Sequence, residues 1–405
     1  MRGCDFVIKR ELYMKKIRPF INAPTVKVLT GIRRCGKSVM LELIQQELKE
    51  SGIKGEQISS VNFESRSIEY IKSVESTYEH IKQKASKTGK KLYLFFDEIQ
   101  ELNGWEKMIN SCMIDFDVDI YITGSNAKLL SGELATYLGG RYVEFKIYPF
   151  SFEEITLAMP DTNTTELFTT YLTRGGMPFL YQYPLDEQSA MQYLNDIFDS
   201  ILLKDIATRN KVRNIELLRR IIQFFIANIG NTFSAGSITK YLKSELRSVS
   251  TETIYNYIEY CKAACLLHLV SREDIIGKKI LQFQEKIYIA DHGIREALYG
   301  NNMRDINQTL ENIVYLELLR RDYNVTVGKS NTKEIDFVAT RQGEKIYVQV
   351  AYLLASDETI EREFSVLEKI HDNYPKYVVT MDEINRGRSG IPNVNIKDFL
   401  LMDKF

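Results

Sequence analysis

Short apolar runs alternate with longer mixed segments through the first third of the chain. Five of these runs have the length and composition of β-strands, and they lie at residues 26–30, 58–63, 91–97, 119–123 and 141–148. Each segment between them is long enough for the helical crossover that parallel strands require. The pattern therefore predicts an α/β domain with a mainly parallel sheet.

The middle of the chain has the spacing of helices instead. Between residues 153 and 227 strand-like alternation is missing, and apolar residues recur at helical intervals. The clearest series is Ile215, Leu218, Ile221, Ile222 and Phe225. We predict mostly helix here, interrupted at YLTRGGMPF (171–179) by a Gly-Gly-Met-Pro turn to which the sequence assigns no role beyond that of a loop.

A helix-turn-helix pattern follows. Residues 237–245 and 251–266 have the character of two short helices separated by a polar turn. The apolar face of the second consists of Ile254, Tyr257, Ile258, Cys261 and Cys265. Apolar runs at 266–270 and 286–290 can then pair as a hairpin. Two helices followed by a hairpin indicate a winged helix-turn-helix.

Strands return at the end of the chain. A helix at 310–321 precedes strands at 325–329, 334–340 and 345–352, and another helix separates these from a strand at 376–380. This is a small α/β unit of about a hundred residues, a typical domain size. Because single hydrophobic cores stop growing at roughly 250–300 residues, we divide the 405-residue chain into regions 1–150, 151–300 and 301–405.

Composition narrows the class of protein. Hydrophobic residues make up 44% and charged residues 26%, as in ordinary globular proteins. The formal net charge of -1 gives no overall electrostatic reason to bind nucleic acid. No apolar run approaches the roughly 18 residues of a membrane span. The cysteines (Cys4, Cys35, Cys112, Cys261 and Cys265) form no CxxC pair and have no histidine at zinc-ligand spacing, so we expect reduced thiols in a cytoplasmic protein.

The segment GIRRCGKS matches the phosphate-binding pattern GxxxxGK[ST]. It lies between an apolar strand ending at Thr30 and a helix over 36–48. Successive backbone N–H groups of such a loop wrap a polyanion, and glycine lets the backbone approach it. We therefore predict an ATP site, although a glycine-rich turn with no ligand would look similar. The candidate binding residues are Gly31, Ile32, Arg33, Arg34, Cys35, Gly36, Lys37, Ser38 and Val39.

Four side chains are candidates for the chemistry at this loop. Lys37 would reach the β- and γ-phosphates, and the Ser38 hydroxyl would ligate Mg²⁺. The apolar run LYLFFDE places Asp97 and Glu98 at the end of a strand. Asp97 should bind Mg²⁺ through water, and Glu98 should polarise the attacking water. The plain alternative is a solvated strand end followed by a helix cap.

Further polar residues follow the next two strands. Ser125 or Asn126, in IYITGSNA, lies where a γ-phosphate could be sensed. Arg141, in YLGGRYVEF, could project toward the nucleotide of a neighbouring subunit and stabilise the transition state. A rim arginine paired with a carboxylate explains Arg141 equally well.

Together these motifs resemble an AAA-type ATPase family of bacteria and archaea. The P-loop, the strand ending in Asp-Glu, TGSNA and PFSFEEI (149–155) carry the resemblance in the first part of the chain. LKDIATRN (203–210), YIADHGIREALYG (288–300) and LENIVYLELLRR (310–321) extend it, since they resemble the uncharacterised domain that accompanies this ATPase. The resemblance implies a P-loop ATPase whose sheet has an extra strand between the P-loop strand and the Asp-Glu strand.

The final region also resembles the restriction-endonuclease-like fold. Active members carry an acidic residue on the first helix, an aspartate on a strand and (D/E)xK on the next strand. Glu311 and Asp336 match the first two positions, but Gln349 and Ala351 stand at the third. Gln349 offers metal one weak carbonyl ligand and Ala351 offers none. We therefore expect an inactive nuclease site.

Two features leave alternatives open. Lys333 or Lys345 could substitute for the missing lysine of the nuclease site. A basic group in the winged-helix region could contact DNA, but a solvated helix face explains it equally well. That group comprises Lys240, Lys243 and Arg247, with Arg219 and Arg220 as additions. The nearby Tyr255, Tyr257 and Tyr260 are more typical of a core or interface than of a base-stacking surface.

We accordingly expect an ATP hydrolase that couples nucleotide state to its carboxyl-terminal regions. DNA, a protein partner or further copies of the chain are the candidate partners. The rival hypothesis is a slow nucleotide-gated switch in which turnover is incidental. A third hypothesis is an ATP-gated nuclease of a defence or mobile-element system, against which the missing lysine argues.

Overall fold

A computed structural model describes residues 8–65, 73–126, 138–244, 249–274, 279–300, 305–330 and 333–405. The chain separates into two compact units. The first, here called the P-loop unit, is formed by Cys4–Ile147 with Ala263–Cys265. The second, the carboxyl-terminal unit, contains Tyr148–Lys262 and Leu266–Phe405.

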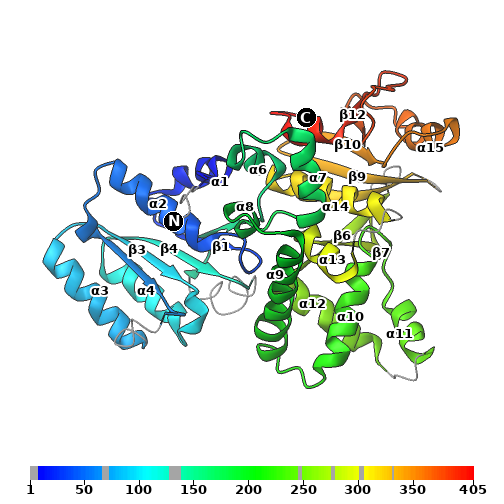
Figure 1. Cartoon of the computed structure of the whole chain (residues 1–405). Helices are drawn as coiled ribbons and strands as arrows, with labels where there is room; N and C mark the ends of the chain where they lie inside the picture. Colours follow the sequence, from blue (N-terminus) through cyan, green and yellow to red (C-terminus); the bar gives the residue numbers. More distant parts are fainter. Residues whose placement is uncertain are drawn as a thin grey trace. The chain divides into compact units, whose positions relative to one another are not determined.

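The P-loop unit is built on a five-stranded parallel sheet of order β2-β3-β4-β1-β5 (Figure 1). The strands are β1 (Val26–Thr30), β2 (Ile58–Asn62), β3 (Leu92–Asp97), β4 (Val118–Gly124) and β5 (Tyr142–Lys146). All lie close to their predicted positions, so the α/β fold class is confirmed. The sheet order places β4 between the P-loop strand β1 and the Asp-Glu strand β3, as the family resemblance implied.

Helices cover both faces of this sheet. They are α1 (Glu11–Ile17), η1 (Arg18–Phe20), α2 (Lys37–Glu50), η2 (Gly55–Gln57), α3 (Val74–Thr88), η4 (Ile99–Glu101) and α4 (Trp105–Asp115). In Figure 1, α2 lies on one face and α3 and α4 on the other. Every residue of β1 and β3 is buried, because a parallel sheet between two helical layers has no solvent-facing side. The carboxyl ends of the strands consequently form the exposed edge available to a ligand.

The carboxyl-terminal unit begins with helices, as predicted. They are α6 (Phe152–Ala158), α7 (Thr164–Arg174), α8 (Phe179–Gln182), α9 (Glu187–Ser200), a π-helix (Ile201–Thr208), α10 (Ile215–Ala227), α11 (Ala235–Ser244) and α12 (Thr251–Ala263). Ile254, Ile258 and Cys261 of α12 are buried, as predicted for its apolar face. Cys265, predicted on the same face, lies beyond the end of α12 with φ 55° and is half-buried. In the part of the chain that the structure describes, no helix combines the length and apolar character that a membrane crossing requires.

A seven-stranded mixed sheet of order β12-β11-β10-β9-β8-β6-β7 forms the rest of this unit. Its strands are β6 (Leu267–Asp274), β7 (Lys279–Ile289), β8 (Asn324–Ser330), β9 (Lys333–Arg341), β10 (Glu344–Val350), β11 (Lys376–Thr380) and β12 (Asn393–Asn395). Four helices accompany them, α13 (His292–Tyr299), α14 (Ile306–Arg320), α15 (Asp357–Glu368) and α16 (Ile396–Leu401).

The predicted hairpin of β6 and β7 is present, with Leu269 opposite Ile287. It does not stand apart as a separate wing, because β6 also pairs in parallel with β8. The sheet therefore continues across residue 300, where the sequence suggested a domain boundary. That position lies inside one compact unit.

The Gly-Gly-Met-Pro turn is a packing junction and not a plain loop. A Cβ atom on Gly175 would lie 2.1 Å from Asp291 Oδ1, and one on Gly176 would lie 2.3 Å from the carbonyl oxygen of Phe150. On Gly293 it would meet another backbone carbonyl oxygen at 2.2 Å. Gly176 N donates to Asp291 Oδ2 at 2.7 Å, and Phe150 N donates to Gly176 O at 2.7 Å. The glycines of GGMP and of ADHG are thus required by the same close approach of backbones.

Candidate nucleotide-binding site

The backbone of the P-loop is shaped by residues with positive φ. Gly31 has φ 152°, and a Cβ atom on it would lie 2.1 Å from the carbonyl oxygen of Ile147. Arg34 and Gly36 follow with φ values of 68° and 100°, and Gly36 caps the amino terminus of α2. The loop therefore lies between β1 and the helix as predicted. Its helix terminus presents N–H donors, which favour an anion.

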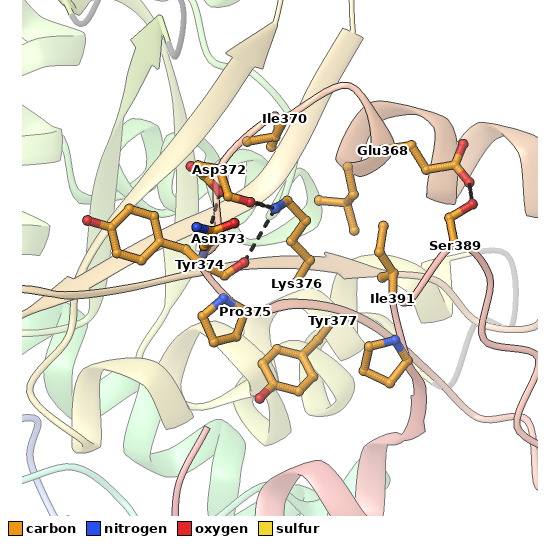
Figure 2. Close-up of a pocket in the computed structure, with 13 residues that line it drawn as sticks. Glu368, Ile370, Asp372, Asn373, Tyr374, Pro375, Lys376, Tyr377, Ser389 and Ile391 are labelled. Carbon is orange, nitrogen blue, oxygen red and sulfur yellow. Dashed lines mark hydrogen bonds and ion pairs between the residues drawn. The ribbon is translucent and has the colours of Figure 1, made fainter.

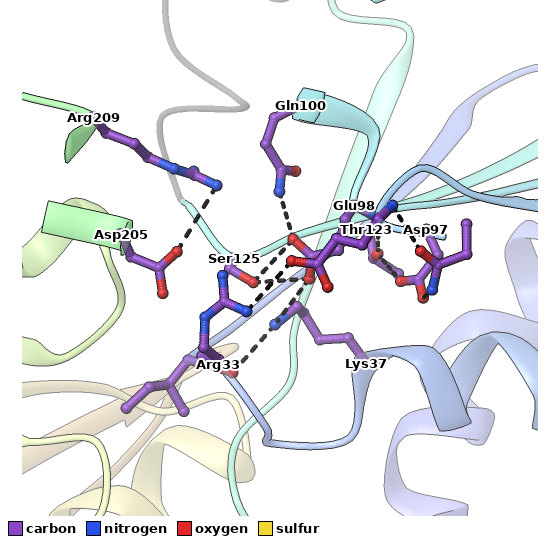
Figure 3. Close-up of polar contacts among 12 residues, drawn as sticks. Arg33, Lys37, Asp97, Glu98, Gln100, Thr123, Ser125, Asp205 and Arg209 are labelled. Atoms are coloured by element: carbon purple, nitrogen blue, oxygen red, sulfur yellow. Dashed lines mark hydrogen bonds and ion pairs between the residues drawn. The ribbon is translucent and has the colours of Figure 1, made fainter. Parts of the chain in front are cut away.

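The side chain of Lys37 points into this loop (Figure 3). Its ammonium donates to the carbonyl oxygens of Gly31 at 3.0 Å and Ile32 at 3.2 Å. It also lies 4.0 Å from Glu98 Oε1. A buried ammonium between loop carbonyls and a carboxylate lies where an anion in the loop would meet it.

Asp97 and Ser38, the two predicted Mg²⁺ residues, lie together. Asp97 ends β3 and accepts hydrogen bonds from Asn62 Nδ2 at 2.8 Å and from the hydroxyl groups of Thr123 and Ser38. Burial raises the pKa of Asp97 above its ordinary value, against the lowering effect of the Thr123 and Ser38 bonds. The site gathers oxygen ligands, which is what Mg²⁺ prefers.

Glu98 is held from several sides (Figure 3). Ser125 Oγ donates to both of its carboxylate oxygens, at 2.8 and 3.1 Å, and Gln100 Nε2 donates to Oε2. Glu98 has φ 51°, and its N–H donates to Thr123 Oγ1 at 3.0 Å. Burial would raise the pKa of Glu98, but the Lys37 charge and the bonds from Gln100 and Ser125 outweigh it and lower the pKa. Glu98 is therefore ionised at neutral pH.

The structure separates the two candidate phosphate sensors. Ser125 bonds Glu98 directly, while Asn126 is buried one residue further along, at the same edge of the sheet. Gln100 and Thr123 were not predicted as part of the site. Gln100 reaches Glu98 only because the chain turns into η4 directly after β3, and no spacing rule signals that turn.

The other P-loop residues have different surroundings. Ile32 and Cys35 are buried, Val39 is half-buried and Arg34 is exposed. Arg33 Nη1 lies 3.5 Å from Glu64 Oε1. Their contribution to a nucleotide would come mainly from the backbone N–H groups of the loop.

Arg141 lies at the opposite edge of the sheet from the P-loop. Its carbonyl oxygen accepts from Val26 N at the start of β1, whereas the P-loop follows the end of β1. Its guanidinium donates to Asn110 Oδ1 at 2.8 Å and to the carbonyl oxygen of Leu138 at 3.2 Å. These contacts join Arg141 to an amide and a carbonyl and not to the carboxylate that we considered as its partner. Arg141 therefore cannot reach a nucleotide in its own P-loop.

The three predicted nuclease-site residues also lie together, around a lysine that the sequence analysis missed. Lys286 Nζ, on β7, lies 3.2 Å from Glu311 Oε2 and 3.5 Å from Asp336 Oδ1. It also lies 2.7 Å from Glu334 Oε1. Burial raises the pKa of both Glu311 and Asp336, and the Lys286 charge opposes this shift. Lys286 thus supplies one positive charge to a cluster of three carboxyl groups.

Gln349, the third predicted residue of the nuclease-like site, is joined to this cluster by hydrogen bonds. Its Oε1 accepts from Asp336 N at 3.2 Å, and its Nε2 donates to Glu363 Oε2 at 2.8 Å. The two lysines predicted as substitutes lie elsewhere. Lys333 Nζ donates to Ser365 Oγ at 2.6 Å, and Lys345 Nζ lies 5.0 Å from the ring centroid of Tyr347. Among the described residues, no three His, Cys, Asp or Glu side chains are arranged to hold a metal ion.

The basic group of the winged-helix region is only partly described. Lys240 and Lys243 are exposed on α11, and Arg247 lies outside the described residues. Arg219 lies 2.6 Å from Asp199, and Arg220 lies 3.2 Å from Glu216. Of the tyrosines, Tyr255 is exposed, Tyr257 is buried and Tyr260 is half-buried. DNA binding by this group of residues therefore stays a prediction from the sequence.

A cleft of about 430 Å³ lies on the carboxyl-terminal unit, between the end of α15, β11 and the loop at 389–392 (Figure 2). Its charged groups already have partners. Lys376 Nζ lies 3.1 Å from Asp372 Oδ1, and Ser389 Oγ donates to Glu368 Oε1 at 2.7 Å. The Ser389 hydroxyl has a carboxylate beside it, but among the described residues no histidine lines the cleft to complete a catalytic triad. The P-loop edge remains the better candidate for chemistry.

Comparisons with known proteins agree with this assignment. Residues 23–156 match a family model described as an AAA domain, and residues 165–305 match a domain of unknown function. An uncharacterized protein of Haemophilus influenzae is 38% identical over 400 residues, covering 98% of this chain and 99% of that protein. An uncharacterized protein of Methanocaldococcus jannaschii is 29% identical over 409 residues, covering 97% of this chain and 88% of that protein.

Solved structures give a weaker likeness. Cdc6p from Pyrobaculum aerophilum is 11% identical, covers 77% of this chain and 97% of its own, and superposes with a TM-score of 0.33. The Aeropyrum pernix ORC1 protein in complex with DNA is 13% identical, covers 73% of this chain and 93% of its own, and has a TM-score of 0.32. Scores this low carry no argument about function.

Proposed function

Since this chain belongs to one family with the uncharacterized Haemophilus influenzae protein, and its residues 23–156 match an AAA-domain model, we propose that it binds MgATP and hydrolyses it to ADP and phosphate. One observation carries the proposal. Lys37, Asp97 and Glu98 converge at the carboxyl edge of a parallel sheet, next to a loop in which Gly31 has no room for a Cβ atom. A phosphate cradle, oxygen ligands and an ionised carboxylate are what phosphoryl transfer to water requires.

Binding would begin with the loop. Backbone N–H groups of residues 31–39 would surround the phosphates, and the Lys37 ammonium would turn from the loop carbonyls to the β- and γ-phosphate oxygens. Asn126, at the neighbouring strand end, would contact the γ-phosphate. An ammonium already desolvated in the loop exchanges partners at little cost, since hydrogen bonds to charged phosphate are stronger than those to neutral carbonyls.

The Ser38 hydroxyl and the Asp97 carboxylate would hold Mg²⁺, Asp97 through water. Both are oxygen donors, and they are already hydrogen-bonded to each other at the sheet edge. Asn62 and Thr123 fix the Asp97 carboxylate from the other side. When bound, Mg²⁺ neutralises the charge that develops on the β- and γ-phosphates.

Glu98 would orient the attacking water and draw its proton. Its lowered pKa keeps the carboxylate ionised at neutral pH, as this role requires. The Ser125 and Gln100 bonds limit the directions in which the carboxylate can point. Arg141 would add its charge only to the nucleotide of another copy of the chain, because its own P-loop lies at the far edge of the sheet.

Steady-state phosphate release by the full chain, with MgATP and with or without DNA, tests this proposal. Lys37→Ala should abolish binding, and Glu98→Gln should leave binding intact while lowering kcat at least a hundredfold, the usual effect of losing a general base. A slow rate that Glu98→Gln does not change would favour the switch. The contacts of Glu98 with Ser125, Gln100 and Lys37 also favour the switch hypothesis. They occupy the carboxylate that would have to bind water, as expected of an enzyme in a resting state.

Mixing variants tests the proposed role of Arg141 between copies of the chain. Arg141→Ala and Glu98→Gln should each be inactive alone. Mixed, they should recover part of the activity, because some interfaces then join an intact P-loop to an intact Arg141. No recovery in assemblies shown to contain both chains would contradict the role in trans.

For the carboxyl-terminal unit we propose a nuclease-like site that does not cleave DNA. The proposal is supported by Ala351 at the position of the expected lysine and by Lys286, whose ammonium lies beside the Glu311 and Asp336 carboxyl groups that a metal ion would need. Incubation of the chain with plasmid DNA and Mg²⁺ or Mn²⁺ should leave the plasmid intact. Cleavage that Asp336→Ala abolishes would overturn this proposal and favour the ATP-gated nuclease.

A further inference from the structure

The segment that precedes β1 contacts the backbone of the P-loop. Residues 8–25, here called the amino-terminal strap, contain α1 and η1. Arg10, directly before α1, is 2% exposed, and its Nη1 donates to the carbonyl oxygen of Cys35 at 3.0 Å. Cys35 stands in the middle of the P-loop. We propose that Arg10 is a positioning residue of the P-loop, which holds the loop backbone in the conformation that binds phosphate.

Peptide geometry explains how one bond can do this. The C=O of Cys35 and the N–H of Gly36 belong to one planar trans peptide, so they point in opposite directions. A donor that fixes the carbonyl oxygen therefore also fixes the direction of the Gly36 N–H. That N–H is one of the group that would surround a phosphate.

The carbonyl needs such a donor. Cys35 has no exposed surface, and a buried carbonyl oxygen without a partner destabilises the fold. A guanidinium also places a positive charge behind the loop. Burial raises the pKa of the Cys35 thiol, and the charges of Lys37 and Arg10 oppose this shift, which places both cations close to the loop.

Arg10 is itself held in an uncommon conformation. Its φ of 46° and ψ of 52° lie in the left-handed region, which is unfavourable for a non-glycine residue. Its carbonyl oxygen accepts from Tyr13 N at 3.0 Å and Met14 N at 3.2 Å, and so starts α1. Its guanidinium lies 4.6 Å from the ring centroid of Tyr13. Strain that the surrounding contacts maintain is found at functional positions, which is consistent with a positioning role.

A second arginine of the strap provides a matched control. Arg18 donates to Glu47 through Nε at 2.7 Å and through Nη2 at 2.9 Å. Glu47 lies on α2, more than two turns beyond the P-loop. Arg18 therefore fastens the strap to the helix and not to the loop. A comparison of Arg10 and Arg18 variants therefore distinguishes two effects. One is a general weakening of the contacts of the strap, and the other is loss of the hydrogen bond to the Cys35 carbonyl oxygen.

The inference rests on the proposed MgATP site, and the test compares Arg10→Met, Arg10→Lys and Arg18→Met in the full chain. Arg10→Met should weaken MgATP and MgADP alike by about tenfold, the effect of one charge-assisted hydrogen bond. KM should rise in proportion and kcat should change by less than about twofold, since ground state and transition state lose the same interaction. Arg10→Lys should recover part of the affinity, and Arg18→Met should bind as the wild type does. Equal affinities in Arg10→Met and Arg18→Met would overturn the inference.

A second measurement needs no nucleotide. The rate at which a thiol reagent labels Cys35, followed by peptide mass spectrometry, should rise in Arg10→Met and stay unchanged in Arg18→Met. Equal labelling in both variants would also overturn the inference, whether or not ATP binds. A wild type that binds no MgATP would overturn the proposed function instead. Should Arg10→Met fail to fold, Arg10→Gln replaces it in both measurements. Glutamine keeps the first two methylene groups of the arginine side chain and lacks its charge.

Discussion

The Ser125 hydroxyl donates hydrogen bonds to both carboxylate oxygens of Glu98, at 2.8 and 3.1 Å. Ser125 follows β4 and Glu98 follows β3, so the contact joins the ends of two adjacent strands. A γ-phosphate bound at this edge would compete for the same hydroxyl. The position of the base would then depend on the state of the nucleotide.

Ser125→Ala is accordingly expected to lower kcat about tenfold, because Glu98 loses a charge-assisted hydrogen bond that orients it. The same bond helps to hold the pKa of Glu98 below its ordinary value. Without it, more of the carboxyl is protonated under mildly acidic conditions. The acid limb of the kcat profile should therefore move to higher pH, which phosphate release measured from pH 5 to 8 would reveal.

Ser86→Ala is a matched control for this prediction. Ser86 is an exposed serine on α3 whose hydroxyl donates to the carbonyl oxygen of Lys82. Its replacement should leave both kcat and the pH profile unchanged. A Ser125→Ala enzyme with wild-type kcat and an unshifted profile would show that the hydroxyl does not orient the base.

Lys286→Met should destabilise the carboxyl-terminal unit by about 3–5 kcal/mol, the usual cost of removing one partner of a buried ion pair. Burial raises the pKa of Glu311 and Asp336, so their folded-state pKa values lie above the unfolded ones. Such groups cost stability as pH rises, because they must ionise in a buried place. The loss should therefore be larger at pH 8 than at pH 5 in urea unfolding.

Lys345→Met provides the comparison for Lys286→Met. Its ammonium lies over the Tyr347 ring and outside the cluster. We expect a change below about 0.5 kcal/mol with little dependence on pH, as for a surface substitution. If the two variants lost equal stability, Lys286 would not be the compensating charge.

Local spacing was enough to predict the centre of the P-loop site. Lys37 and Ser38 belong to one loop between a strand and a helix, and Asp97 and Glu98 follow directly from the end of a buried strand. In each case a short pattern specifies both the residue type and the element that carries it. Parallel strands then bring their carboxyl ends to one edge, so the assembly of these residues follows from the α/β pattern.

Contacts between distant parts of the chain could not be predicted in this way. Lys286 reaches Glu311 and Asp336 because β6 pairs in parallel with β8, and no local pattern determines which strands become neighbours. Arg10 and Cys35 are joined by a single side chain across 25 positions. The same pairing of β6 with β8 explains why a boundary near residue 300, reasonable from the order of predicted helices and strands, falls within one sheet.

Gly176→Ala tests the packing junction between the GGMP and ADHG segments. The new methyl group would meet the Phe150 carbonyl oxygen at 2.3 Å, so the backbone must move and strain the bond from Phe150 N to Gly176 O. We expect a loss of at least about 1–3 kcal/mol, the cost of overpacking a closely packed site. Thermal unfolding followed by circular dichroism measures it.

Gly236→Ala is the control for the junction. Gly236 lies in α11 at an ordinary φ, and a Cβ atom on it would have its nearest neighbour, Ser234 Oγ, at 3.6 Å. Alanine there should be neutral or stabilise by up to about 1 kcal/mol, because it reduces the entropy of the unfolded chain. Equal losses in the two variants would contradict a special role for Gly176.

His292 lies in the same junction between the GGMP and ADHG segments. Its titration makes the stability of the folded protein depend on pH. Its Nε2 lies 2.6 Å from the carbonyl oxygen of Tyr171, to which the neutral ring donates, and burial lowers the pKa of His292 to about 4. The unfolded chain has the ordinary pKa of about 6.5, so between these values the unfolded state binds more protons. Stability from this group is therefore complete above pH 6.5 and is lost as pH falls toward 4.

At pH 5 the loss amounts to about 2 kcal/mol relative to pH 7.5, since each pKa unit corresponds to about 1.4 kcal/mol. Asp291 beside it has the opposite dependence, because burial raises its pKa to about 7, so the wild type alone would give a mixed result. His292→Gln removes the titrating group while keeping an amide donor for Tyr171. Urea unfolding of both proteins at pH 5 and pH 7.5 isolates the contribution, because Asp291 is common to them. The wild type should lose about 2 kcal/mol more than His292→Gln on acidification, and parallel losses would mean that His292 is protonated in the folded protein as readily as in the unfolded chain.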